Sequence, residues 1–282
     1  LVNLKKKSFG GGFNFLKYLK FKLNKRNILA KSIKDADVIL INSHHNFIKA
    51  IFAKFLLRNK VFVHRIDGPI SKYTNRKDYR DQLAFLLNKY VADATIYQSK
   101  WSKNKLNFKN KKNTVIYNSA DSRFYYKKKT KKITNSIIIS SWSKNFNKGF
   151  LYYKYLDENI NFRKYKINFV GNSDIAFKNI KIFKPMDKNK LSVFLRKHKL
   201  YITASKNDPC SNSLLEAIAC GLTPLGLKSG GHPELINDKR FLFRSKKDLF
   251  KKIHLYFKNK NNKRFHTKDS TIKYEEFFNF IT

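Results

Sequence analysis

Short continuous apolar runs alternate with segments of helical spacing along the first half of the chain. The runs that predict strands are residues 37–41, 60–64, 94–97 and 114–117, and the segments that predict helices are residues 47–57 and 82–91. Strands that are apolar at successive positions are typical of a parallel sheet covered by helices on both faces. The pattern therefore predicts a doubly wound α/β domain.

The same alternation restarts after a charge run from Ser122 to Lys132. The predicted strands there are 136–140, 167–171, 200–203 and 223–226, and the predicted helices are 149–156, 187–197 and 213–220. The tail from Lys246 has a helical pattern in two pieces, separated by a polar stretch from Lys258 to Lys263. We expect a second Rossmann-like domain facing the first across a cleft, with ligands at the carboxyl ends of the strands.

These patterns divide the chain into four parts. Residues 1–125 are predicted to form the N-terminal Rossmann-like domain, 126–132 the linker, 133–258 the C-terminal Rossmann-like domain, and 259–282 a C-terminal helix that is expected to pack back on the first domain. A charge run without an apolar face is typical of a linker. The same run could instead be a solvated excursion within one domain.

The chain carries a formal net charge of +42, from 61 Lys and Arg against 19 Asp and Glu. Such a charge suits a polyanion partner, but the lysines are spread through nearly every segment, together with many Asn, Ile, Phe and Tyr residues. A bias in base composition explains that spread, and selection for an anionic partner is the alternative. We expect no specific nucleic-acid partner, although the charge would favour peripheral contact with an anionic membrane leaflet.

Two further features bear on location. No apolar run approaches the ~18 residues that a membrane-spanning helix needs, and the basic start from Leu1 to Lys7 is not followed by the apolar core of a signal peptide. Cys210 and Cys220 are expected to be reduced thiols. These features predict a cytoplasmic protein that could lie peripherally on the inner face of the cell membrane.

The segment from Thr203 to Gly221 runs from a strand end through a polar loop into a helix, the layout of a binding site. Asp208 and Glu216 straddle the predicted helix N-terminus, where exposed N–H groups favour an anionic ligand group. The polar residues of this turn are Ser211, Asn212 and Ser213. Two other interpretations stay open: Ser213 and Glu216 fit a capping box, and Asp208 could be an ordinary turn residue.

Two more loops follow strands of the predicted second domain. The first contains Lys144, Lys148 and Gly149, and a lysine at such a turn can neutralise a diphosphate. The second contains Gly230 and Gly231, which let the backbone approach a ligand closely or simply form a connecting turn.

In this order, these elements resemble the GT-B glycosyltransferases of family 4, also called glycosyl transferases group 1, from about Gly10 to Phe243. The spacing of Asp208 and Glu216 resembles the family's E-x7-E motif, and Lys148-Gly149 resembles its phosphate-binding Lys-Gly. Residues 92–99 and 116–121 resemble two further segments of its N-terminal domain. The resemblance implies a GT-B fold with an acceptor-binding N-terminal domain and a donor-binding C-terminal domain.

The resemblance also implies an activity: transfer of a sugar from a nucleotide-sugar donor to an acceptor hydroxyl, with no metal and no separate cofactor. Asp208 would contact the donor sugar, Glu216 the ribose and Lys148 the diphosphate. Family members are mostly retaining, and a glycan or lipid-linked acceptor in cell-surface polysaccharide synthesis is the expected context. Two departures put the donor geometry in doubt: Asp208 is shorter than the usual Glu, and Lys144 stands in for a missing arginine.

For the acceptor side, the resemblance points to the turn at Gly11 and Gly12, after Gly10. The segment that carries His64, Arg65 and Asp67 also ends a predicted strand at the expected cleft. Arg65 and Asp67 could orient the acceptor hydroxyl or form an ion pair that shapes the loop. The metal-binding pattern Asp-x-Asp occurs at residues 35–37, but it precedes a strand instead of ending one, so no metal site is predicted.

Two other functions are weighed against this one. A non-catalytic polyanion or nucleic-acid binding protein would suit the charge but leaves Asp208 and Glu216 unexplained. A sugar-nucleotide epimerase of the same architecture would need further acids or bases, for which His64 and His232 are the candidates.

Overall fold

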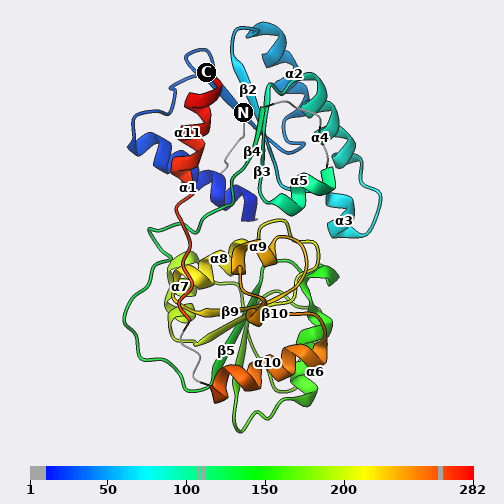
Figure 1. Ribbon diagram of the computed structural model, residues 1–282, viewed down its shortest axis with the longest axis vertical. Helices are drawn as coiled ribbons and strands as arrows, with labels where there is room; N and C mark the ends of the chain where they lie inside the picture. The colour runs from blue at the N-terminus through cyan, green and yellow to red at the C-terminus, as the bar shows by residue number, and fades with distance from the viewer. Residues whose placement is uncertain (1–10, 107, 109–111, 260–262) are drawn as a thin grey trace. The chain divides into compact units, whose positions relative to one another are not determined.

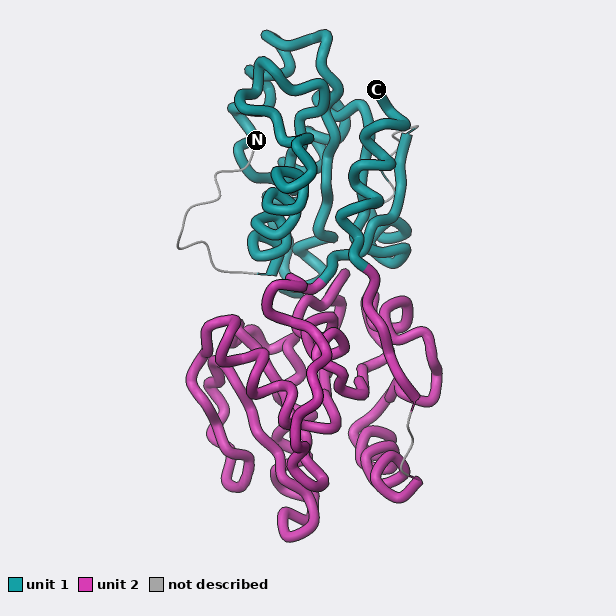
Figure 2. Tube along the Cα trace, turned by 90° about the vertical axis from the view of Figure 1, so that its left-hand side faces the viewer, with its two compact units in different colours: residues 1–119, 269–282 teal, residues 120–268 magenta. Residues whose placement is uncertain are grey.

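The computed structural model describes residues 11–106, 108, 112–259 and 263–282; Gly10, the basic start and residues 260–262 of the polar stretch lie outside this range. The chain forms two compact units. Unit 1 contains the residues up to Ser119 together with Asp269–Thr282, and unit 2 contains Ala120–Lys268 (Figure 2). The chain therefore passes between the units twice, after Ser119 and after Lys268.

Unit 1 is built on a parallel sheet in the order β1-β2-β3-β4. Its strands are β1 (Val38–Asn42), β2 (Val61–Ile66), β3 (Ala94–Tyr97) and β4 (Lys112–Val115). Its helices are α1 (Gly11–Lys25), α2 (Phe47–Leu56), α3 (Ile70–Thr74), α4 (Tyr79–Tyr90), α5 (Lys100–Leu106) and α11 (Thr271–Ile281). Helices α1 and α11 share one apolar core with the sheet, and α2 and α4 share another, so both faces are covered (Figure 1).

Helix α11 comes from the far end of the sequence and belongs to unit 1. Tyr274 and Phe277 of α11 lie in the same buried cluster as Phe15 of α1. An ion pair of 3.2 Å joins Arg26 to Glu275 at the edge of this contact. The helix starts at Thr271, well after residue 259, because residues 263–269 have no regular structure.

Unit 2 is built on a parallel sheet in the order β10-β9-β8-β5-β6-β7. Its strands are β5 (Ser136–Ser141), β6 (Lys166–Gly171), β7 (Lys181–Phe183), β8 (Leu200–Thr203), β9 (Thr223–Leu227) and β10 (Leu242–Phe243). Its helices are α6 (Phe150–Asn159), α7 (Lys188–Arg196), α8 (Asn212–Ala219), α9 (His232–Ile236) and α10 (Lys246–Lys258), with short 3-10 turns η1 (Phe146–Lys148) and η2 (Lys239–Phe241). None of the described helices in either unit is long and apolar enough to cross a membrane.

The segment expected to link the domains lies within unit 2. Tyr125 is buried in the core of that unit. Arg196 of α7 donates to the carbonyl oxygens of Phe124 and Tyr126, at 3.2 and 3.4 Å, and the Lys132 ammonium donates to the carbonyl of His198 at 2.8 Å. The boundary between the units therefore falls at residues 119–120 instead of 125–126, because the first part of the charge run packs into unit 2 through Tyr125 and through the hydrogen bonds from Arg196.

Gly149 is a position where only glycine fits. Its φ is +89°, which L side chains rarely adopt, and a Cβ there would lie 2.4 Å from Cβ of Ala204. The loop after β5 is thereby pressed against the loop after β8, and the Lys206 amide donates to the Asn147 carbonyl at 2.7 Å.

Gly149→Ala is expected to lower the free energy of unfolding by roughly 2–4 kcal/mol, from the left-handed backbone and the overlap with Ala204 together. Urea denaturation would measure it. The matched control is Gly12→Ala, since Gly12 lies in helix α1 and a Cβ there would meet nothing closer than 3.6 Å. A loss of stability in the control equal to that of Gly149→Ala would contradict the steric argument.

Candidate functional site

The strand order of unit 2 fixes where a ligand would bind. From β5 the chain continues to β6 on one side, whereas β8 pairs with β5 on the other side. In open α/β sheets, ligands bind at the carboxyl ends of the strands where the order reverses in this way. The loops that leave β5 and β8 at this point contain Lys148 and Asp208. The sheet thus brings together two of the residues that the sequence singled out.

Lys148 and Asp208 form an ion pair with 3.0 Å between Nζ and Oδ2, and their side chains are only 21% and 11% exposed. Burial by itself would raise the pKa of Asp208. The charge of Lys148 and the hydrogen bonds from Lys148 and the Cys210 amide outweigh it, so this pKa lies below its usual value. A largely desolvated cation therefore lies at the switch point of the sheet, paired with a buried carboxylate.

The glycine turn after β9 packs against the backbone of Asp208. Gly230 has a φ of +59°, and a Cβ there would lie 2.3 Å from the Asp208 carbonyl oxygen. The Gly231 amide donates to that same oxygen at 2.9 Å, and the Asn207 amide donates to Ser229 Oγ at 3.0 Å. Loops from three neighbouring strands thus hold one another, which fixes the carboxylate in place.

His232 opens α9 next to this pair and is fully buried. Desolvation lowers its pKa, and its neighbours Asp208 and Lys148 shift that pKa in opposite directions, so the ring is neutral near pH 7. Nδ1 lies 3.0 Å from the Leu227 carbonyl, which can only accept, so Nδ1 carries the proton. Nε2 is then an acceptor, and it has no hydrogen-bond partner among the described residues. A buried acceptor without a partner is costly unless a ligand or water satisfies it.

Glu216 lies on α8, close enough to Asp121 and Lys188 for their charges to affect its pKa. Burial, with a smaller contribution from Asp121, raises the pKa of Glu216 to about 8, and Lys188 opposes the shift. Asp121 itself is paired with Arg123 at 2.7 Å and with Lys188 at 3.3 Å. The Glu216 carboxyl is therefore protonated in a large part of the molecules at neutral pH, and in that form it can donate as well as accept a hydrogen bond.

Tyr201, within β8, connects the two parts of the site. Its buried hydroxyl lies 3.1 Å from Ser140 Oγ on β5, and it also bonds to Ser213 at the start of α8. The charges of Lys148 and Glu216 both act on it. Tyr201, Asp121 and Lys188 were not proposed as site residues from the sequence, because Tyr201 reads as strand core and Lys188 as one surface lysine among many.

The capping box that was the alternative interpretation of Ser213 and Glu216 is not formed. The N-cap of α8 is Ser211, and the helix begins at Asn212, so Ser213 and Glu216 lie further along the helix than a capping box requires. Ser211 makes no capping hydrogen bond, and its Oγ lies 3.3 Å from that of Ser213. Glu216 consequently projects from within the helix and not from its first turn.

Lys144, the other lysine of the β5 loop, is placed differently from Lys148. Its ammonium forms an ion pair with Asp174, and both side chains are more than half exposed. The lysine is therefore a solvated surface cation. Cys210 and Cys220 are both buried and are not joined by a disulfide.

In unit 1 the candidate residues surround a buried guanidinium. Arg65 is fully buried, and its ion pair with Asp67 is 2.8 Å long. It also donates to Asn42 Oδ1 at 2.5 Å, to Asn118 Oδ1 at 2.6 Å and to the Tyr274 hydroxyl at 3.0 Å. Arg65 thus shapes the ends of the strands, whereas the Asp67 carboxylate, which Gln98 also contacts, is 36% exposed and can meet a ligand.

The remaining candidates of unit 1 divide into two kinds. Gly11 and Gly12 open α1, and a Cβ on Gly12 would lie 3.6 Å from both Asp67 carboxylate oxygens, so Gly12 and Asp67 are neighbours. His64 is fully buried, with Nε2 2.9 Å from the Ser43 carbonyl and Nδ1 3.3 Å from Asn88 Nδ2. Burial lowers its pKa to about 4. Both ring nitrogens are engaged inside unit 1, which leaves none for an acceptor or for the proton transfer of an epimerase.

No group of three or more His, Cys, Asp or Glu side chains that could hold a metal ion occurs within residues 11–106, 108, 112–259 and 263–282. Asp35, from the Asp-x-Asp pattern, accepts a hydrogen bond of 2.8 Å from Ser32.

The raised pKa of Glu216 makes stability depend on pH. From pH 4.5, its ordinary pKa, to about pH 8, the unfolded chain releases a proton that the folded chain retains. The free energy of unfolding must therefore fall as the pH rises through this window, by an amount on the order of a few kcal/mol. Glu216→Gln is expected to remove the fall, so that the stability of the variant relative to wild type increases from pH 5 to pH 8. Urea denaturation at several pH values measures this, and parallel curves for the two proteins would contradict the assignment.

Comparison with known proteins adds two findings. Residues 175–273, which include Asp208, Glu216, Gly230 and Gly231, match the family model described as Glycosyl transferases group 1. The comparison with curated protein sequences gave no match.

Solved structures resemble the whole chain. HepE of Anabaena, in complex with UDP, is 16% identical with a TM-score of 0.67, and the match covers 96% of this chain and 86% of that one. Sucrose-phosphate synthase of Thermosynechococcus elongatus is 15% identical with a TM-score of 0.63, covering 97% and 77%. The catalytic domain of starch synthase IV from Arabidopsis thaliana, bound to ADP and acarbose, is 12% identical with a TM-score of 0.66, covering 96% and 78%. The chain has the GT-B fold, and with the family match this fold supports a glycosyltransferase.

Proposed function

We propose that this chain transfers a sugar from a nucleotide-sugar donor to an acceptor hydroxyl, as a retaining enzyme of family 4 that needs no metal or separate cofactor. The observation that carries the proposal is the buried Lys148–Asp208 pair at the switch point of unit 2. A cation already desolvated and held in place can stabilise a leaving diphosphate without reorganising during the reaction. That HepE and starch synthase IV were solved with UDP and ADP supports a nucleoside diphosphate as the group bound here.

Each donor group has a candidate partner in unit 2. Lys148 would contact the diphosphate, while Asp208 would accept from hydroxyls of the donor sugar. Glu216 would bind the ribose hydroxyls, for which a carboxyl near its pKa at neutral pH can serve as donor or acceptor. The polar residues at the start of α8 and the glycine turn would line the rest of the donor site; they are Ser211, Asn212, Ser213, Gly230 and Gly231.

In the reaction, the acceptor hydroxyl would attack the anomeric carbon of the donor sugar, and the bond from that carbon to the diphosphate oxygen would break. Lys148 would stabilise the negative charge that develops on this oxygen, with a contribution from N–H groups at the start of α8. In unit 1, the exposed Asp67 carboxylate, beside Gly12 and held by Arg65, would orient the acceptor. A glycan or lipid-linked acceptor of the cell surface is the proposed context.

His232 is proposed as an additional contact of the donor sugar. Its Nε2 is a buried acceptor beside Asp208, and a sugar hydroxyl is a donor that would satisfy it. A neutral histidine suits this role better than a charged one, because it accepts without adding to the positive charge of Lys148.

Lys148→Ala is expected to lower kcat/KM by ~10²-fold or more, because a preorganised charge is lost from the leaving group. The donor is first identified by thermal shift against UDP-, GDP-, ADP- and CDP-sugars, with pyrophosphate and duplex DNA as controls. The matched control variant is Lys154→Ala, an exposed lysine of α6 that pairs only weakly with Glu158, at 3.9 Å. A near-normal rate in Lys148→Ala would exclude the phosphate role, and equal stabilisation by every polyanion would favour a charge-driven binder.

His232→Leu is expected to weaken binding of the nucleotide-sugar by roughly 5–10-fold, the loss of about one hydrogen bond. Binding of the corresponding nucleoside diphosphate should hardly change, since it lacks the sugar. Isothermal titration calorimetry with both ligands measures the difference. Equal weakening for the two ligands would mean that the substitution disturbs the fold of the site and not a sugar contact.

A further inference from the structure

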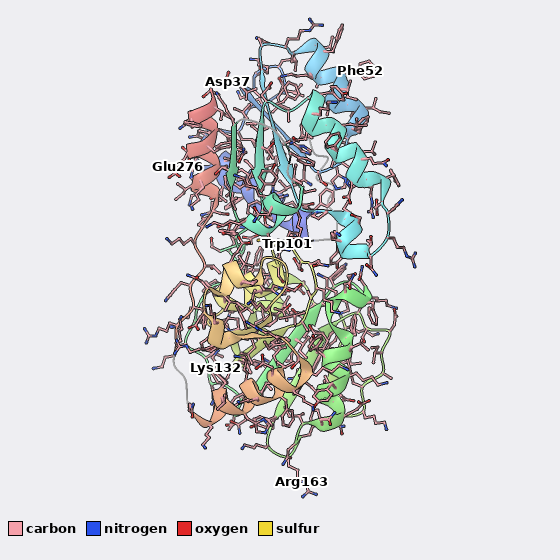
Figure 3. The ribbon with its side chains drawn as sticks, turned by 45° about the vertical axis from the view of Figure 1, so that its right-hand side comes forward. Asp37, Phe52, Trp101, Lys132, Arg163 and Glu276 are labelled. Carbon is pink, nitrogen blue, oxygen red and sulfur yellow. The ribbon has the colours of Figure 1, made fainter. Side chains whose placement is uncertain are left out.

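Helix α2 is oriented against the usual pattern of a helix that covers a sheet. Such a helix normally buries its large apolar residues and exposes polar ones. In α2 the two buried residues are the small Ala50 and Ala53. Its large apolar residues, which we call the α2 apolar face, are between 43% and 74% exposed; they are Ile48, Ile51, Phe52, Phe55 and Leu56. Figure 3 shows Phe52 on the outer side of the helix, away from the sheet.

The neighbouring helix α4 also carries exposed apolar residues. It lies beside α2 on the same face of the sheet (Figure 1), and its Phe85, Leu86 and Tyr90 are also exposed. Single exposed apolar residues are ordinary, but a contiguous group of this kind on a soluble surface marks a place of contact.

The charges around the α2 apolar face are positive. Lys49 is exposed on α2, the Arg58 guanidinium lies 5.0 Å from the centre of the Phe55 ring, and the Lys89 ammonium lies 4.8 Å from that of Tyr90. Helix α2 contains no acidic residue.

Two acidic residues, one on α4 and one just after it, are engaged within unit 1. Asp81 of α4 accepts from the amides of Ile70 and Ser71, at 2.7 and 2.9 Å. Asp93 accepts from the Phe62 amide and pairs with Lys54. The surface therefore presents large apolar side chains within a cationic rim.

We propose that the α2 apolar face is a docking surface for an anionic lipid bilayer. An interfacial helix with aromatic and aliphatic residues on one side and lysine or arginine at its edges inserts its apolar face at the level of the headgroups, and anionic lipids attract the rim. A second copy of the chain would meet this face with the same cations, and each copy carries a net charge of +42. The lipid surface satisfies both the apolar and the charged part of the face.

The test is co-sedimentation of the full chain with vesicles of phosphatidylcholine, with and without roughly 30% phosphatidylglycerol. Phe52→Ser with Phe55→Ser is expected to lower the partition coefficient for the anionic vesicles by ~10-fold or more, because two side chains that insert are lost. The matched control is Ile272→Ser with Phe280→Ser on α11, two apolar residues that are also exposed, and it should bind as the wild type does. Binding by the wild type should weaken at high salt and without phosphatidylglycerol.

Three outcomes would overturn the proposal: no binding of the wild type to anionic vesicles, equal binding by the Phe52/Phe55 variant, or a dimer in sedimentation velocity that this variant dissolves. Since both residues are exposed, the variant should keep its unfolding temperature. It should also bind nucleotide-sugars normally, because the residues proposed to bind the donor belong to unit 2. A failure of the membrane proposal is therefore distinguished from a failure of the proposed activity.

Discussion

A lysine ammonium that is removed from water requires an anion, and this requirement organises the candidate site of unit 2. Lys148 lies in the loop after β5 and Asp208 in the loop after β8. These two strands are neighbours because the strand order of the sheet reverses at β5. The backbone of Asp208 packs against the turn at Gly230, where the absence of a side chain lets the two backbones come into contact. A cation fixed in this way can bind phosphate by exchanging one anionic partner for another, since the cost of desolvation has already been met in folding.

Unit 1 contains a second buried cation, with a different consequence. The Arg65 guanidinium donates to partners on β1, on the segment after β4 and on α11. Because Tyr274 is one of these partners, helix α11 contributes to the buried polar network of unit 1 as well as to its apolar core. A guanidinium satisfied from so many sides is structural, whereas its exposed neighbour Asp67 keeps a face toward solvent.

The large positive charge has a local meaning that its total does not reveal. Lysines spread over the whole sequence do not by themselves indicate a partner. At α2, lysine and arginine lie beside the α2 apolar face. Cations together with exposed aromatic residues suit the surface of an anionic membrane, which neither feature alone would indicate. The same reasoning separates Lys148 from Lys144: both lie in the loop after β5, but one is buried against a carboxylate and the other is a solvated surface charge.

The sequence by itself determined many of the strands and helices and several of the chemistry-bearing positions, because both follow from local patterns. Strands β3 and β8 occupy the residues predicted for them, and Lys148, Asp208 and Glu216 were singled out from their spacing. Tertiary structure decided what these residues experience. The partner of Lys148 is 60 residues away and that of Arg65 in α11 is 209 residues away; the pKa of Glu216 depends on burial, and the buried acceptor on His232 depends on which carbonyl its other nitrogen meets. The periodicity of a sequence shows which face of a helix or strand is apolar. Ion pairs, desolvation and the direction that the apolar face of α2 takes depend on contacts between distant segments, and only the folded chain creates those contacts.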